Sequence, residues 1–148
     1  MTLHSSISLA SLGVLAVLAG CGGSLRLSAA TPMRATPIAE VQVVYGADLD
    51  QGKLDVLNDL EVAVHMQAAL RSSFPVGNGP RMLVMITRYR TGRWGPTRMN
   101  ADATLVGPDG TVQQTIPVSS TTIRGSNARS KTQRVAQDCV NQLVGSLP

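Results

Sequence analysis

The sequence predicts an α+β domain built as a two-layer sandwich, with two helices on one face of a four-stranded mixed sheet. Three observations lead to this prediction. Alternating apolar and polar residues mark four strands, two longer stretches repeat apolar residues at the helical spacing, and the patterns follow the order β-α-β-β-β-α. Because amphipathic helices and a half-apolar sheet bury their apolar sides against each other, two layers result.

The first strand is expected at residues 38–45 and the first helix at residues 51–73. Asp50 is a suitable N-cap, because its carboxylate can accept hydrogen bonds from the free backbone N–H groups of the first turn. The helix is expected to end at Phe74-Pro75, before a Gly-Asn-Gly-Pro turn at residues 77–80. Its buried stripe is predicted to consist of Val56, Leu57, Leu60, Ala63, Val64 and Leu70.

Three further strands are expected at residues 81–91, 99–107 and 111–123, followed by a helix at 128–147 that Asn127 helps to cap. The first β-α-β step should be a right-handed crossover, which makes its two strands parallel, and the remaining strands should form a meander. Pro108-Asp109-Gly110 favours a tight turn, and Pro117 favours an edge position for its strand. The apolar stripe of the last helix comprises Val135 or Ala136, Cys139, Val140, Leu143 and Leu147.

The amino-terminal apolar run begins at Ile7 and ends in Leu18-Ala19-Gly20-Cys21. It is shorter than the roughly 20 apolar residues that span a bilayer and suits the apolar region of a signal peptide. The four residues resemble the lipobox of bacterial lipoproteins. The resemblance implies cleavage between Gly20 and Cys21 and acylation of Cys21, which would anchor the chain in a membrane.

The resulting organisation is a lipoprotein signal peptide at residues 1–20, a flexible tether at 21–37 and a single α+β domain at 38–148. The tether is expected from its Gly, Ser, Ala and Pro content. An alternative remains open, because Ser28-Ala29-Ala30 offers an ordinary cleavage site before Thr31 that would release a soluble periplasmic protein. Gly22 stands where the lipoprotein pattern places Asp for inner-membrane retention. The resemblance therefore implies the periplasmic face of the outer membrane.

The net charge of +4 is unevenly distributed along the chain. Residues 40–61 contain six acidic residues against Lys53, whereas residues 71–98 contain six arginines and no acidic residue. Behind a secretion signal, nucleic acid is not an expected partner of this basic region. Anionic lipid headgroups, lipopolysaccharide phosphates or an acidic protein surface are the alternatives. The arginines can also be the solvated face of ordinary strands and helices.

Trp94 among neighbouring arginines is the most distinctive local feature. Tryptophan and arginine are frequent interface anchors, because one offers a large rigid apolar area and the other several hydrogen-bond donors. The alternative is that Trp94 folds back and caps the core. The candidate residues for contact with a partner or with headgroups are Arg88, Arg90, Arg93, Trp94 and Arg98.

No pattern in the sequence predicts catalysis, a metal site or a cofactor. His65 is the only histidine after Cys21 and has no evident nucleophile beside it in the sequence. His/Cys pairs at zinc-ligand spacing are absent from the sequence. If Cys21 is acylated, Cys139 has no partner for a disulfide and is expected to be a small buried apolar residue. The chain is therefore not expected to be an enzyme.

A second resemblance involves Gly92 and Arg98, the strand at residues 101–105, the turn Pro108-Asp109-Gly110 and the closing helix. Together they resemble a family of small proteobacterial envelope lipoproteins of unknown function, over roughly residues 38–147. The sequence departs from that family in the direct step from Asp109 to Gly110 and in having Trp94 inside the connection. More distantly, the element order is similar to the amino-terminal domain of TolB and to curli-secretion and penicillin-binding-protein-activator lipoproteins.

These resemblances imply an interaction module rather than an enzyme. The expected function is that of a lipid-anchored accessory protein of the cell envelope, which faces the periplasm and docks on another envelope protein or on copies of itself. The alternative is a lipoprotein that binds lipid or lipopolysaccharide through its arginine-rich hairpin.

Overall fold

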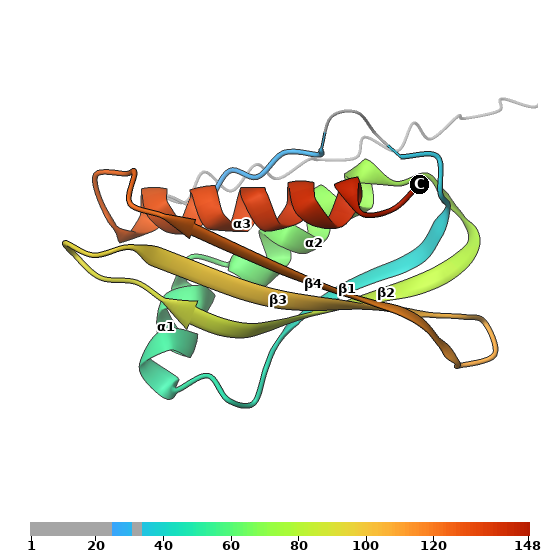
Figure 1. Cartoon of the computed structure of the whole chain (residues 1–148), viewed down its shortest axis with the longest axis horizontal. Coiled ribbons are helices and arrows are strands. Elements are labelled where there is room, and N and C mark those ends of the chain that lie inside the picture. The colour runs from blue at the N-terminus through green and yellow to red at the C-terminus, as the bar shows by residue number, and fades with distance from the viewer. Residues whose placement is uncertain (1–24, 31–33) are drawn as a thin grey trace, which may run out of the picture.

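A computed structural model describes residues 25–30 and 34–148 of the chain. It confirms the predicted class: the domain is α+β, with helices packed on one face of a four-stranded mixed sheet (Figure 1). The elements are β1 (Ile38–Tyr45), α1 (Gln51–Asp59), α2 (Val62–Ser73), β2 (Val76–Arg90), β3 (Thr97–Val106), β4 (Val112–Thr122) and α3 (Ala128–Gly145).

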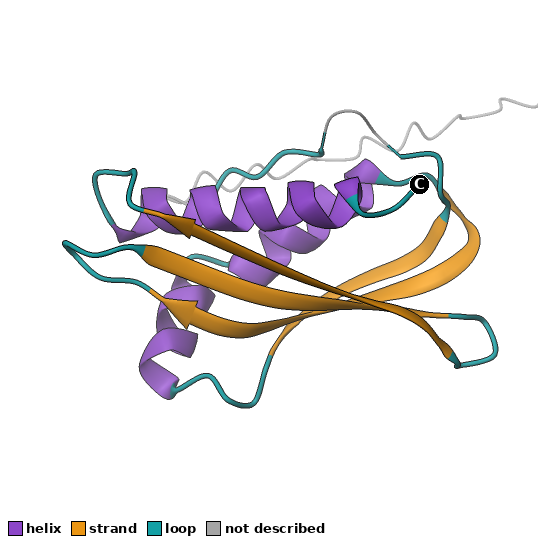
Figure 2. Ribbon diagram, in the orientation of Figure 1, coloured by secondary structure: helices purple, strands orange, loops and turns teal. Residues whose placement is uncertain are grey.

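The strands lie in the order β1-β2-β3-β4 (Figure 2). β1 pairs in parallel with β2, and the other two pairings are antiparallel, as the sequence predicts. β4 is an edge strand, which explains why Pro117 is tolerated there: a strand with a free edge has backbone N–H groups that need no partner.

The core lies between the sheet and the helices. On β2 the buried row is Met82, Val84 and Ile86, and on β3 it is Met99, Ala101, Ala103 and Leu105. β2 is an interior strand, between β1 and β3. Its second apolar row faces the open side of the sheet, where Met85 is 39% exposed. Among the described residues, no helix is both long enough and apolar enough to cross a bilayer.

The predicted single helix at residues 51–73 is in fact two helices. The backbone breaks at Glu61, whose φ of 51° lies in the left-handed region. The Tyr45 hydroxyl occupies the break, where it donates to the Leu57 carbonyl oxygen at 3.1 Å and accepts from the Ala63 amide at 3.1 Å. The break changes which side of α2 faces the core, because the helical periodicity starts again after Glu61.

The predicted stripe is consequently wrong in part. Val64, which the unbroken helix would bury, is 64% exposed. The side chains that α2 buries instead include Val62 and Met66, together with the correctly predicted Leu70.

The predicted turn at residues 77–80 is also wrong, because these residues belong to β2. The strand begins at Val76, which is the register partner of Ile38 on β1. Gly79 allows the backbone before β1 to pack closely against β2, because a Cβ at this position would overlap the carbonyl oxygen of Pro37.

Both predicted helix caps are confirmed. Asp50 accepts from the Lys53 amide at 3.0 Å at the start of α1. Asn127 accepts from the Ser130 amide at 2.8 Å, and Ser130 completes a capping box with the Asn127 amide at the start of α3. The helix ends at Gly145, two residues before the predicted end.

Cys139 is buried in the core, as predicted, and burial raises the pKa of its thiol to about 12, with a further contribution from the charge of Asp138. The thiolate is the reactive form of cysteine. In a Cys21→Ser variant, whose single thiol is Cys139, we expect iodoacetamide at pH 8 to leave the native protein unmodified and to alkylate it in denaturant. Equal rates in both conditions would contradict the burial.

The raised pKa also has a consequence for stability. Because the folded state holds the thiol proton more tightly than the unfolded state, the stabilisation is complete below the ordinary pKa of 9.0. It is lost as the pH rises from there towards 12.

Candidate functional site

The candidate site lies where β2 extends beyond β1. Tyr45, the last residue of β1, is the register partner of Ile86, so β2 continues for four residues without β1 beside it. A bulge between Ile86 and Arg88 then changes which side chains face the helices. Tyr89 becomes buried, and Arg88 and Arg90 turn outward.

Three predicted contact residues come together at this point. Arg90 on β2 is the register partner of Arg98 on β3, and Arg98 donates from Nε to the Thr121 hydroxyl at 3.1 Å. Arg88, Arg90 and Arg98 line an open pocket of about 600 Å³ with Asp48, Leu49, Lys53, Thr87 and Tyr89.

These arginines are not neutralised by an ion pair within the described part of the chain. The ion pair found there joins Lys53 with Asp50, and His65 Nε2 lies 3.6 Å from a Glu61 carboxylate oxygen, a contact that does not involve the arginines. The pocket therefore has an excess of positive charge, which suits an anionic group.

The other two predicted contact residues, Arg93 and Trp94, lie in the connection between β2 and β3 (Figure 1). Trp94 is 91% exposed, so the alternative in which it caps the core is wrong. The Arg93 guanidinium lies 5.6 Å from the centre of the Trp94 ring, within the range of a cation–π interaction. The connection thus presents an aromatic ring and a cation together to the surroundings.

A buried lysine fixes this connection. Lys131, in the first turn of α3, is only 5% exposed. Its Nζ donates to the carbonyl oxygens of Gly95 at 3.0 Å and of Gly92 and Arg93 at 3.4 Å each. An ammonium group has three donors and is costly to bury unless all are used, so these carbonyls must stay in place around it.

A second bond ties the end of β2 to α3. The Thr132 hydroxyl donates to the Ala128 carbonyl at 2.7 Å, which leaves the Tyr89 hydroxyl as donor to Thr132 at 2.6 Å. The β2–β3 connection is therefore held by α3 and is not an independent loop.

We expect a Lys131→Met variant to fold but to lose the fixed position of this connection. Methionine fills similar apolar space, while the exposed loop carbonyls can turn to water, so the cost should stay within about 2 kcal/mol. Trp94 is the only tryptophan, and its fluorescence anisotropy should fall in the variant. An Arg134→Met variant, which changes an exposed cation of the same helix, should leave it unchanged.

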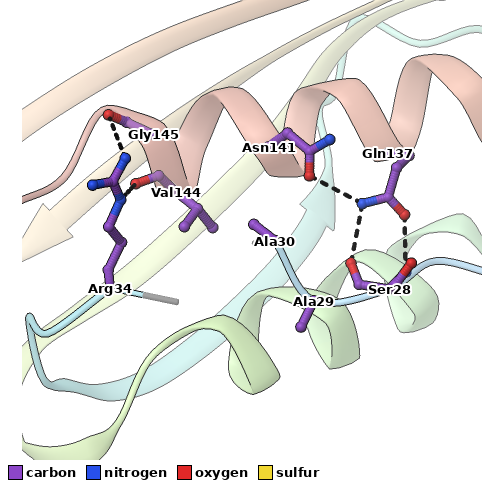
Figure 3. A pocket seen from close by; sticks show the side chains of 8 residues that line it. All are labelled: Ser28, Ala29, Ala30, Arg34, Gln137, Asn141, Val144 and Gly145. Atoms are coloured by element: carbon purple, nitrogen blue, oxygen red, sulfur yellow. Dashed lines mark hydrogen bonds between the residues drawn. The ribbon is translucent and has the colours of Figure 1, made fainter. Parts of the chain in front are cut away.

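Residues 25–30, which the sequence analysis assigns to a flexible tether, lie extended along α3. The Gln137 side chain makes two hydrogen bonds with the backbone of Ser28. It accepts from the Ser28 backbone N–H at 2.9 Å and donates to the Ser28 carbonyl oxygen at 3.0 Å (Figure 3). Gln133 accepts from the Arg26 amide at 3.2 Å. Leu25 is 1% exposed and belongs to the core. Leu27 is partly buried against the same core. The segment therefore packs on the domain through its two leucines.

Arg34, the next described residue after Ala30, lies near the other end of α3. Arg34 donates to the carbonyls of Val144 at 3.0 Å and Gly145 at 3.5 Å, near the carboxyl end of that helix (Figure 3). A cation is favourable there, because the last carbonyls of a helix have no intrahelical partner. The predicted cleavage and acylation residues, Gly20 and Cys21, lie outside the described residues.

The sequence thus indicates the arginines and Trp94 as candidate contacts, but not Lys131 or the docked segment at residues 25–30. In the sequence Lys131 is one of several basic residues close together, with Arg129 and Arg134, and no local pattern marks it as buried. The alternation of Leu25 and Leu27 with polar residues was the available signal for docking. No group of three or more His, Cys, Asp or Glu side chains suited to a metal occurs within residues 25–30 and 34–148.

A scan against protein-family models finds no match to this sequence, and a search of curated proteins finds none either. Solved structures do match. A Xanthomonas campestris protein of family DUF330 aligns with a TM-score of 0.55 and 11% identity, over 83% of this chain and 90% of that protein. A dodecameric PelC from Paraburkholderia phytofirmans aligns with a TM-score of 0.45 and 17% identity, over 84% of this chain and 98% of PelC.

The match to the DUF330 protein shows a shared fold. It agrees with the α+β class that the strand and helix patterns predict.

Proposed function

We infer that this chain is a lipid-anchored accessory protein of the bacterial cell envelope that works by binding rather than by catalysis. The proposed anchor is Cys21, at the end of the sequence that resembles a lipobox. The proposed location is the periplasmic face of the outer membrane. The proposed binding surface is the basic end of the domain, formed by the β2–β3 connection, its neighbouring arginines Arg88, Arg90 and Arg98, the β4–α3 connection and the first two turns of α3.

One observation supports a binding role above all others: an exposed tryptophan is held in place by a buried lysine. Exposing Trp94 leaves a large apolar area in water, and burying Lys131 removes a charge from water. Both features are unfavourable for the isolated domain. They are consistent with a preorganised surface that binds another component of the envelope.

The alternative of acyl-chain binding inside the domain has less support. It needs an apolar space between the sheet and the helices. The side chains that occupy this position are in mutual contact and almost fully buried, including Met66, Leu70, Met82 and Leu143. A ligand is therefore better accommodated on the basic surface than in the interior.

Intact mass spectrometry tests the anchor. The protein purified from membranes should have the mass of a chain that begins at Cys21 plus acyl groups. The Cys21→Ser variant should lose the acyl mass and the membrane association together. A mass that corresponds to a chain beginning at Thr31 would contradict the proposal, because residues 21–30 would then be absent from the mature protein.

A further inference from the structure

We propose that the basic end of the domain rests on the anionic phospholipid surface of the membrane that holds Cys21, with Trp94 in the headgroup region. This inference rests on the proposed function, since it takes Cys21 as the anchor. It adds a partner of defined chemistry, the phosphate groups of phospholipids, and an orientation of the domain with the amino-terminal end of α3 towards the membrane.

The docked segment determines where the anchor can be. Leu25 is buried and follows Cys21 by four residues. A chain of four residues reaches about 14 Å at most, whatever its conformation. Because the Arg26 amide, one residue further on, is bound to the Gln133 side chain, the acylated residue must lie within about 18 Å of that side chain, which projects from the second turn of α3. A freely moving tether of 17 residues would have imposed no such limit.

The β2–β3 connection is bound to the same part of α3. Lys131 holds the connection, and Gln133 holds the segment that leads to the anchor. The two residues are separated by only about 3 Å along the helix axis. Figure 1 shows that the β2–β3 connection and the β4–α3 connection project from this end of the molecule, past the first turn of α3.

The side chains at this end suit a phospholipid surface. Indole rings favour the boundary between water and the apolar phase, because they combine an apolar body with one N–H donor. Arg93 lies beside the ring, Arg124 is exposed in the β4–α3 connection, and Arg134 is exposed in the second turn of α3. Two acidic residues lie among these cations: Asp138 lines the groove with Arg26 and Arg134, and Asp48 lines the pocket with Arg88, Arg90 and Arg98.

A phospholipid surface is favoured over an acidic protein for a geometric reason. The anchor brings the membrane to this end of the domain whenever the protein is in place, whereas a protein partner would have to be recruited there. The cations are spread over three separate elements, which matches an extended anionic plane better than a single pocket.

The single tryptophan makes the proposal directly measurable. The acylated protein would be reconstituted into vesicles of phosphatidylcholine, with and without phosphatidylglycerol. In the phosphatidylglycerol vesicles, Trp94 emission should shift to shorter wavelength, acrylamide should quench it several-fold less than in detergent, and brominated lipid should quench it. Added salt should weaken all three changes, since screening reduces the attraction.

A matched pair of variants tests the role of charge. Arg124→Glu combined with Arg134→Glu reverses two cations at the basic end, and should abolish the emission shift while leaving the acyl mass unchanged. Arg71→Glu combined with Arg81→Glu changes the net charge equally, at exposed positions near the opposite end of the domain. That variant should retain the shift.

The possible failures are distinguishable. An acylated protein whose Trp94 stays accessible to acrylamide on phosphatidylglycerol vesicles would overturn this inference and leave the proposed function standing. Protection of Trp94 in native membranes but not on protein-free vesicles would also overturn it, in favour of a protein partner. A chain without acyl mass would overturn the anchor and this inference together.

Discussion

Replacing Gly79 by alanine is expected to destabilise the domain by about 3 to 4 kcal/mol, a large part of the 5–15 kcal/mol typical of a domain. The new Cβ would overlap the carbonyl oxygen of Pro37 and lie 2.7 Å from its carbonyl carbon. These are backbone atoms at the start of β1 and cannot move away as a flexible side chain can. The parallel pairing of Ile38 with Val76 should open.

Urea unfolding followed by circular dichroism would measure the loss. The matched control is Gly95→Ala in the β2–β3 connection, because a Cβ at Gly95 meets nothing within 4 Å. We expect its unfolding free energy to stay within about 0.5 kcal/mol of the wild-type value. Equal midpoints for the two variants would show that Gly79 is not packed against Pro37.

Gly79 also shows why one part of the fold could not be predicted. Glycine and proline usually mark turns, and Gly77-Asn78-Gly79-Pro80 fits that rule. Here the glycine is needed for the approach of another strand, from a residue 42 positions earlier in the sequence. A local pattern cannot distinguish these two uses, because the second depends on a tertiary contact.

The break between α1 and α2 is a similar case. The residues around Glu61 include neither glycine nor proline, and the apolar spacing reads as one continuous helix. The break depends on the hydroxyl of Tyr45, which comes from β1 and takes the place of helical backbone partners. The strand order and both helix caps were predictable, because alternation, turns and capping residues act over short distances.

The part of the candidate site that could be predicted is the group of arginines that lie close together in the sequence. Arg88, Arg90 and Arg98 sit on two paired strands, so sequence spacing is enough to bring them together. Lys131 was not recognisable as the support of the β2–β3 connection, because its burial depends on three carbonyl groups that this connection supplies. Charged residues are almost always solvated, and only the tertiary structure reveals the exception.

Leu70→Ala and Val64→Ala should differ strongly, although the sequence places both side chains in one apolar stripe. Leu70 is fully buried, so its truncation leaves a cavity and should cost about 2 to 5 kcal/mol. Val64, on the same helix, is exposed and should change stability by less than about 0.5 kcal/mol. An unbroken helix from residue 51 to 73 would bury both side chains and make both variants costly. Urea unfolding of the pair therefore tests whether the chain breaks at Glu61, since comparable losses would contradict the break.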